Sequence, residues 1–483
     1  MLGAANCWHM DRAEAEAIYG SGRKACVEVL LALANQVERL EGRVERLEEE
    51  IRELRRDSDN SSLPPSADPG AGTRRQRQRK RSDRKPGGQP GHPGSGRGLL
   101  PIEQVDEVIE HLPERCGRCE GSLADRPARG PIGRHQVAEL PEIAVRVTEH
   151  RLARRHCPDC GALTGAELPG EVPRGRFGPR LHGAVATLAA GFRLSRRQTV
   201  DLCRELFGLQ IAVGTVDAIV GRQGAALREP QERLCDAVRG SAVVCVDETG
   251  WKQAGQTRFL WGAFSDEAAV VRIAPSRHRE EAEALLGDTE AIVSSDRWWA
   301  YDHLHTARRQ VCWSHLLRDF RFHAESPLAH QSEFGESCLE IADGVFSAWR
   351  EFQRSGDRRR LRRQVAPLER DLRALCEQGR RKSVKTRYHR GLARNLTKAW
   401  PALWTFLEHK GVEPTNNRAE RGLRHAVIYR KLSQGSRCER GARATERLLS
   451  AAITCRLQGR SLFAYLVEVT QASIRGQPTP ALV

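Results

Sequence analysis

The sequence has no long apolar run and no secretory start. No window approaches the roughly 18 uncharged apolar residues that a membrane helix needs, so no membrane span is expected. Residues 1–7 lack a basic region followed by an apolar run, so no signal peptide is expected either. Acidic residues are also in deficit, with 62 Asp and Glu against 78 Lys and Arg and a formal net charge of +16. These absences argue against a membrane protein and favour a polyanionic partner, nucleic acid first.

Cysteine is plentiful, with 14 residues, and four of them form two Cys-x-x-Cys pairs. Without a secretory signal they are expected to be intracellular thiols, a few of them metal ligands. Cys116 and Cys119, like Cys157 and Cys160, lie in a tight turn with a glycine close behind. Four thiolates suit one tetrahedral, structural Zn²⁺. Residues 142–149 resemble a strand, which favours a zinc ribbon with a long hairpin, and a redox pair is the alternative.

The first strongly periodic stretch is a heptad seam. Residues between its apolar positions are dense in Glu and Arg, which is typical of a coiled coil and implies self-association or a partner helix. One amphipathic helix packed on its own protein is the alternative. The seam consists of Leu33, Val37, Leu40, Val44, Leu47, Ile51 and Leu54.

A basic segment follows a cluster of turn residues. Between residues 74 and 85, eight Lys or Arg stand against the single Asp83, and residues 85–94 are rich in Pro and Gly and cannot form a helix or a ladder. A solvated linker is expected that also touches phosphates without reading sequence. The side chains assigned to this contact are Arg74, Arg75, Arg77, Arg79, Lys80 and Arg81.

Residues 180–222 are predicted to form two or three short helices. Gly208 breaks the helical pattern, and Thr215 is a candidate N-cap for the helix that follows. Arg196 and Arg197 lie at the front of the first of these helices. The pattern fits a helix-turn-helix DNA reader and fits an ordinary helical hairpin equally well.

The centre of the chain is predicted to be a mixed sheet. The order is strand, strand, strand, helix, strand, helix, strand, and a three-strand meander followed by parallel crossovers is the ribonuclease H-like arrangement. In that sheet the first and fourth strands are neighbours. The strands are expected at residues 241–247, 259–265, 269–276, 291–296 and 309–315, with a helix at 277–286.

Two of these strands end in a carboxylate. The first is predicted to end in the acidic pair Asp247–Glu248 and the fourth in Asp296. On neighbouring strands Asp247 and Asp296 would converge, and two close carboxylates repel unless a divalent cation such as Mg²⁺ lies between them. An Asp that merely ends a strand is the alternative for each.

Two further motifs lie beyond the sheet. Cys312 and His315 form a Cys-x-x-His pair with no second pair nearby, which favours packing at a strand end or a DNA contact. Residues 316–410 are predicted to be helical and charged. Asn416 or Asn417 can then cap a helix with Glu420 in its first turn, beside Arg418, Arg421 and Arg424. A capped basic amphipathic helix without further function is the alternative.

Together these residues resemble the transposases of the insertion sequence 66 family. The likeness extends over residues 38–467. It is carried by the Cys₄ module and by Asn-Ser-Ser-x-Pro-Pro-Ser at 60–66, Arg-Lys-Pro-Gly-Gly-Gln-Pro-Gly-His at 84–92, Val-Asp-Glu-Thr at 246–249, Cys-Trp-x-His at 312–315 and Asn-Asn-x-Ala-Glu-Arg-x-Leu-Arg at 416–424.

The resemblance implies a DDE-type catalytic domain with Asp247, Asp296 and Glu420 as its carboxylates. They would hold two Mg²⁺ or Mn²⁺ ions that activate the attacking water or 3′-hydroxyl and stabilise the leaving oxygen. Arg418, Arg421 and Arg424 would neutralise phosphates of the scissile strand, or are plain surface charges. The family usually has Gly after its second Asp, and here Arg297 is expected to alter that turn.

The expected protein is a transposase that binds the ends of an insertion sequence and catalyses cleavage and strand transfer. Its partners would be transposon-end and target DNA, a second copy through the coiled coil, and accessory proteins of the same element, in the bacterial cytoplasm at the nucleoid. A non-catalytic zinc-containing DNA-binding regulator and a ribonuclease H-like nuclease without strand joining are the alternatives.

The predicted organisation combines α+β and α/β parts. It comprises an undetermined N-terminus at 1–29, a coiled coil at 30–57, a basic linker at 58–100, a Cys₄ zinc-binding domain at 101–172, a helical DNA-binding region at 173–232, a catalytic domain at 233–430 with a helical insertion at about 316–412, and a C-terminal helical region at 431–483.

Overall fold

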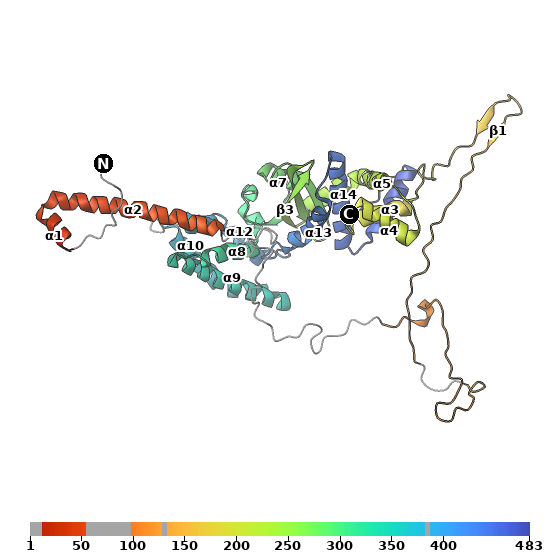
Figure 1. The fold of residues 1–483 in the computed structure, drawn as a ribbon, viewed down its shortest axis with the longest axis horizontal. Helices are drawn as coiled ribbons and strands as arrows, with labels where there is room; N and C mark the ends of the chain where they lie inside the picture. Colours follow the sequence, from red (N-terminus) through yellow and green to blue (C-terminus); the bar gives the residue numbers. More distant parts are fainter. Residues whose placement is uncertain (1–11, 55–97, 128–132, 382–386) are drawn as a thin grey trace. The chain divides into compact units, whose positions relative to one another are not determined.

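The structure, a computed structural model, describes residues 12–54, 98–127, 133–381 and 387–483 (Figure 1). It divides into two units, residues 1–72 with 147–483 in one and residues 73–146 in the other. Within the described ranges, no helix is both long and apolar enough to cross a membrane. The predicted phosphate-contacting side chains at residues 74–81 lie outside the described residues.

Helices make up most of the regular structure. Their bounds are α1 (Arg12–Gly20), α2 (Arg23–Leu54), α3 (Pro179–Ala190), α4 (Arg196–Phe207), α5 (Val213–Ala226), α6 (Arg228–Arg239), α7 (Arg279–Leu286), α8 (Trp313–Ala324), α9 (Ala329–Ser355), α10 (Arg358–Gly379), α11 (Arg387–Lys398), α12 (Trp400–Glu408), α13 (Asn417–Ser433), α14 (Glu439–Leu457) and α15 (Leu462–Arg475).

A five-stranded mixed sheet has the predicted strand order. Its order is β5-β4-β3-β6-β7, so the first and fourth strands of the sheet, β3 and β6, are neighbours. The meander β3-β4-β5 is antiparallel, and β3-β6 and β6-β7 are parallel. The strands are β3 (Val243–Gln253), β4 (Gln256–Phe264), β5 (Ala269–Ala274), β6 (Ile292–Ser295) and β7 (Arg309–Val311).

Three details of the predicted sheet are wrong. β3 does not end at its acidic pair but continues to Gln253, because β4 pairs with it along that whole length and the tight turn at Ala254–Gly255 joins them. The helix expected between β6 and β7 is replaced by two 3₁₀ turns, η3 (Trp299–Tyr301) and η4 (Thr306–Arg308). β7 ends at Val311, and Cys312 then caps α8.

The free edge of β5 is covered by α14. Backbone N–H groups of Ala269 and Val271 donate to the hydroxyls of Thr454 (3.0 Å) and Ser450 (2.9 Å), and that of Ile273 donates to Glu446 (2.5 Å). The three acceptors recur every four residues and therefore lie on one face of the helix. The C-terminal region thus completes the central sheet.

The regions around the sheet follow the predicted helical pattern in most respects. Gly208 ends α4 in the left-handed conformation, with φ 60°. Thr215, however, is not the N-cap of α5, because the helix already begins at Val213 with Ala212 at its cap. The stretch between β7 and α13 is helical as predicted, and it forms a hydrophobic core of its own that includes Trp313, Phe334 and Phe406.

The strand predicted at residues 142–149 is not formed. A two-stranded antiparallel ribbon lies later instead, with β1 (Arg154–His156) paired to β2 (Leu163–Gly165). This shift encloses Cys157 and Cys160 in the ribbon's turn. An alternating apolar pattern needs a partner strand to become a ladder, and residues 142–149 have none.

Candidate active site

Strand register brings Asp247 and Asp296 to neighbouring positions. β3 and β6 run parallel and pair Val243 with Ile292 and Cys245 with Ser294. Asp247 and Asp296 each lie two residues beyond the Cys245–Ser294 pair. The same register therefore places them side by side where the parallel pairing stops. The predicted convergence of the two carboxylates follows from this pairing.

The electrostatic setting of Asp247 is unfavourable for its charged form. Burial, followed by the negative charges of Glu248 and Asp296, raises the pKa of Asp247 to about 8. Its Oδ1 accepts one hydrogen bond, from the Glu248 N–H at 2.9 Å. A carboxylate held beside two others in a partly enclosed site is a ready ligand for a cation.

Glu248 has a different role from its neighbour Asp247, and no spacing pattern in the sequence indicates that role. Its side chain is 1% exposed and forms an ion pair with Arg277, while Tyr301 donates to it at 2.7 Å. Arg277 also lies over the Trp298 ring, with 4.3 Å from its guanidinium carbon to the ring centre. Glu248 therefore ties β3 to the segment that follows Asp296.

That segment holds Asp296 in a defined turn. The Trp298 N–H donates to Asp296 Oδ1 at 2.9 Å, and the Trp298 ring N–H donates to the Arg277 carbonyl at 2.9 Å. Arg297, which stands where the resembled family has Gly, is held by an ion pair to Asp319 on α8 at 2.5 Å. Its guanidinium is thus neutralised by a partner outside the acidic cluster.

Helix α13 is fastened to β3 beside Asp247. The Asn416 side chain donates to the Val246 carbonyl at 2.7 Å, and the Trp313 N–H donates to the Pro414 carbonyl at 2.9 Å. Asn416 occupies the N-cap position of α13, but its side-chain oxygen makes no capping hydrogen bond and is buried without a partner. The start of α13, whose first turn carries Glu420, is thus anchored beside Val246, the residue before Asp247. Among the described residues, the group close enough to share a metal ion at Glu420 contains Cys312 and His315 but neither aspartate.

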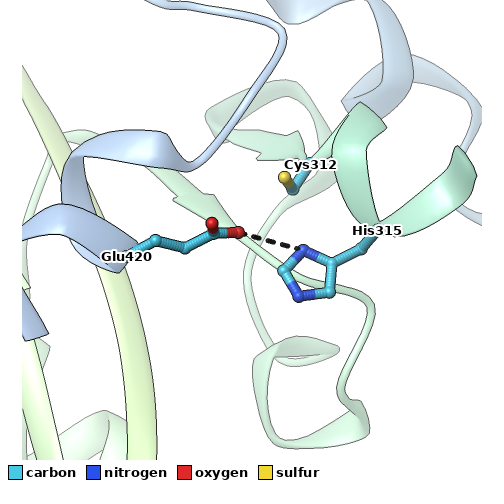
Figure 2. A group of neighbouring side chains, drawn as sticks. All are labelled: Cys312, His315 and Glu420. Carbon is cyan, nitrogen blue, oxygen red and sulfur yellow. Dashed lines mark ion pairs between the residues drawn. The ribbon is translucent and has the colours of Figure 1, made fainter. Parts of the chain in front are cut away.

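Glu420 meets a cysteine and a histidine there (Figure 2). A carboxylate oxygen of Glu420 lies 3.8 Å from His315 Nδ1, and these two atoms together with Cys312 Sγ lie within 4.8 Å of one another. The Glu420 oxygen and His315 Nδ1 are both buried without a hydrogen-bond partner. Thiolate, imidazole and carboxylate are all metal-ligand types, so this group could take part in holding a divalent ion.

His315 is electrostatically coupled to the acidic residues. Burial alone would lower the pKa of His315, but the Cys312 sulfur and then Asp296 outweigh it and raise the pKa to about 9. The positive charge of His315 in turn lowers the pKa of Asp247 against its other neighbours. The acidic residues therefore favour the protonated form of His315 when no metal ion is bound.

Comparison with known families classifies the chain that carries this acidic group. The family model described as the transposase IS66 family matches residues 174–444, more than half of the chain and all of the site just described. The chain belongs to the IS66 transposase family. Members of this family are enzymes that bind and cleave DNA and in general use divalent metal ions.

Other similarities cover the N-terminal part and about four fifths of the chain. A family of unknown function matches residues 10–98 of this IS66-family protein. Two uncharacterized proteins of Sinorhizobium fredii are similar over most of their length. Protein y4hP is 23% identical, covering 79% of this chain and 74% of its own, and y4jD is 24% identical, covering 79% of each.

In this IS66-family chain the two cysteine pairs form equivalent turns. In the first, the Cys116 N–H donates to the Gly121 carbonyl and the Glu120 N–H to the Cys116 carbonyl, both at 2.9 Å. In the second, the Cys157 N–H donates to the Ala162 carbonyl at 2.8 Å and the Gly161 N–H to the Cys157 carbonyl at 2.9 Å. Backbone N–H groups inside each turn lower the pKa of Cys116 and of Cys157. The two pairs belong to different units, so each is described alone.

The predicted DNA-contacting arginines of this family member differ in availability. Arg196 pairs with Asp217 at 3.1 Å and Arg418 with Asp266 at 2.5 Å, so both charges are already partly satisfied. The remaining three are exposed, and no ion pair or hydrogen bond of their side chains is found in the part of the chain that the structure describes. These are Arg197, Arg421 and Arg424.

Two groups escaped sequence reasoning for different reasons. Glu248 was visible as half of an acidic pair, but its partners Arg277 and Tyr301 follow no spacing rule. Cys312 and His315 stood out as a Cys-x-x-His pair for which packing at a strand end or a DNA contact was favoured, and Glu420, which joins them, lies far along the chain on another helix. Only the packing of α13 against β3 makes that group.

Proposed function

We propose that this protein is a DNA transposase of the DDE type, which cuts the ends of its insertion sequence and joins them to target DNA. Asp247, Asp296 and Glu420 would be the metal-holding carboxylates, and Mg²⁺ or Mn²⁺ the ions. The observation that carries the proposal is the shared register of β3 and β6, which sets Asp247 beside Asp296. The fastening of α13 to Val246 supports Glu420 as the third member.

The residues of the site fit a divalent cation. The raised pKa of Asp247 reflects burial and then repulsion from Glu248 and Asp296, and a bound cation would offset both, while the Glu420 oxygen is buried without a partner. Bound ions would polarise an attacking water or 3′-hydroxyl and stabilise the leaving oxygen. The chain itself would orient the ligands, through Tyr301 and Arg277 on Glu248 and through Asn416 on β3.

We also propose that the remaining predicted parts serve DNA binding. The two cysteine turns would share one structural Zn²⁺, and their matching backbone geometry supports this. The α4–α5 hairpin with Arg197 and the basic segment at residues 74–81 would contact the transposon ends. Helix α2 would pair two subunits as a coiled coil, with accessory proteins of the same element as further partners and the bacterial nucleoid as the place of action.

The test is a cleavage assay on a labelled DNA end taken from the element that encodes the protein. Intact protein should nick this end only with Mg²⁺ or Mn²⁺, and Asp247→Ala should abolish nicking while leaving DNA binding unchanged. Asp288→Ala removes an exposed carboxylate outside the site and serves as the matched control. Cleavage by Asp247→Ala near the wild-type rate would sink the assignment.

The same assay separates the competing functions. Joined product in the presence of target DNA favours a transposase, whereas nicking without joining favours a nuclease of the same fold. Tight binding without any cleavage, even with the neighbouring proteins of the element added, favours a DNA-binding regulator.

A further inference from the structure

A cavity of about 460 Å³ lies beside the candidate active site, between helices α8, α9 and α13. Its volume falls in the range of roughly 300–1,000 Å³ that is typical of small-molecule sites. Helix α9 contributes Phe346, Trp349 and Gln353, which are spaced three and four residues apart and so share one face of the helix. We call it the α8–α9–α13 cavity.

The other walls of the α8–α9–α13 cavity come from residues next to the site. Ser314 precedes His315 on α8. Asn417 and Arg421 lie one turn apart on α13, and Glu420 is the immediate neighbour of Arg421. A group bound in the cavity could therefore be part of a longer ligand that also passes Glu420.

The polar groups of this wall are unengaged. In the described ranges of the chain, the side chains of Ser314, Gln353, Asn417 and Arg421 make no hydrogen bond or ion pair with the protein. Buried or half-buried donors and acceptors are normally paired with protein or water. Ser314 and Asn417 are half-buried, and together with the exposed Gln353 and Arg421 they give the cavity wall several unengaged hydrogen-bonding positions for a polar ligand.

The apolar part of the wall limits what that ligand can be. Trp349 and Phe346 are both half-buried and line the same cavity as the amide and hydroxyl groups, and Trp349 also packs on Phe352, with 5.0 Å between ring centres. Glu413, the carboxylate in the wall, can accept from an amino group, and Arg421 can bind a phosphate. A planar, amino-bearing ring attached to a phosphate meets all of these conditions.

We propose that the α8–α9–α13 cavity binds an unpaired nucleobase of the DNA strand that is presented to Asp247, Asp296 and Glu420. The base would stack on Trp349, with its edge on Gln353 and Asn417 and its phosphate on Arg421. A base inside a duplex cannot reach such a pocket, so the nucleotide must be unpaired or rotated out of the stack. The proposal rests on the proposed function for the identity of that strand.

The first test is photochemical crosslinking with the full-length protein. The probe is a DNA duplex with a short single-stranded overhang that carries 5-iodouracil, and the crosslinked peptide is identified by mass spectrometry. The crosslink is expected on α9 at Trp349. A crosslink confined to Trp299, an exposed tryptophan three residues after Asp296, would overturn the proposal.

The second test measures affinity for overhang and blunt DNA by fluorescence anisotropy. Trp349→Leu keeps apolar volume but loses the aromatic face, and it should weaken binding of the overhang about 10-fold, whereas Trp349→Phe should restore most of it. Arg421→Ala should weaken it more than Arg359→Ala, and Gln353→Ala more than Gln378→Ala, because the exposed side chains of the two control residues lie outside the cavity. Equal losses within each pair would contradict the assignment.

The proposed active site and the proposed base pocket can each be disproved without the other. Metal-dependent cleavage by a protein that crosslinks elsewhere would retain the active site and remove the base pocket. A crosslink at Trp349 in a protein that never cleaves DNA, with or without its accessory proteins, would retain the pocket and remove the catalytic proposal. Because Trp349 packs on Phe352 and Phe406, Trp349→Leu should melt below the wild type but stay folded at the assay temperature. Trp349→Phe with intact folding but no recovery of overhang binding would count against stacking.

Discussion

At the scale of single residues, Asp247 is buried in a place that disfavours its charged form. Its folded-state pKa of about 8 lies far above the ordinary value near 4, because it is enclosed beside Glu248 and Asp296. Between about pH 4 and pH 8 the folded metal-free protein therefore binds a proton that the unfolded chain has released. The free energy of unfolding must fall as pH rises through this window.

The variant Asp247→Asn should remove this dependence. Without metal, its melting temperature at pH 8 should exceed that of the wild type by several degrees, since each pKa unit corresponds to about 1.4 kcal/mol. At pH 5 the melting temperatures of the two proteins should be closer. Adding Mg²⁺ should raise the melting temperature of the wild type at pH 8 and leave that of the variant nearly unchanged. Calorimetry of both proteins in EDTA checks this, and Asp288→Asn, an exposed carboxylate, should show the wild-type profile.

Unlike Asp247, the adjacent Glu248 is paired with other side chains. Glu248 is almost fully buried, but Arg277 and Tyr301 satisfy it, so it connects chain segments rather than offering an open ligand position. Alternation along β3 explains the division, since neighbouring residues of a strand point to opposite faces. A single acidic pair thus provides one ligand and one structural tie.

At the scale of elements, α14 substitutes for a sixth strand. Its side chains Thr454, Ser450 and Glu446 accept from the N–H groups of β5 that a neighbouring strand would otherwise bind. An uncovered edge is a template for pairing with other chains. The helix therefore protects the sheet and links the C-terminal region to the site-bearing strands.

Removing one of these acceptors should be costly. Ser450→Ala leaves the Val271 N–H buried without a partner, and we expect a loss of about 1–3 kcal/mol in the free energy of unfolding. Ser347→Ala on the exposed face of α9 should cost little. Urea unfolding of the two variants provides the comparison, and similar midpoints would show that water reaches the β5 edge.

The cysteine turns lead to a metal prediction. Backbone N–H groups in each turn lower the pKa of its first thiol. A lower pKa favours the thiolate, which is the form that binds a metal ion. Purified protein should contain one zinc per chain by elemental analysis. Cys157→Ser should lose it, whereas Cys438→Ser, an exposed free cysteine elsewhere, should retain it. Zinc retained in full by Cys157→Ser would refute a four-thiolate site.

At the scale of the whole molecule, α2 has an apolar side without cover. Leu40, Val44 and Leu47 of its heptad seam are 53%, 50% and 50% exposed. A helix of this length gains stability mainly from burying such a face. The seam therefore predicts that two or more chains associate through α2.

A charge on the seam should separate the subunits. The wild type should elute as a dimer or larger species in light-scattering chromatography, and Leu40→Asp should reduce the measured mass, because it places a carboxylate at an interface position. Leu31→Asp changes an equally exposed leucine off the seam and should leave the mass unchanged. A monomeric wild type would remove the coiled coil.

Local patterns were sufficient for the strand order, the pairing of Asp247 with Asp296 and the helical nature of the segment between β7 and α13. Each depends on periodicity or on turn residues within a short stretch, which physical rules read directly. The same rules misplaced the end of β3 and predicted a strand at residues 142–149. Strand limits depend on the partner strand, and a pattern in one segment carries no information about its partner.

Contacts between distant segments were decided by the tertiary structure. Glu248 meets Arg277 and Tyr301, Glu420 meets His315, and α14 meets β5, all across chain separations at which sequence spacing says nothing. These contacts arise because buried polar groups must find partners wherever packing brings them. Burial also sets the charge state of the site, since the same Asp247 side chain would titrate near pH 4 in an unfolded chain.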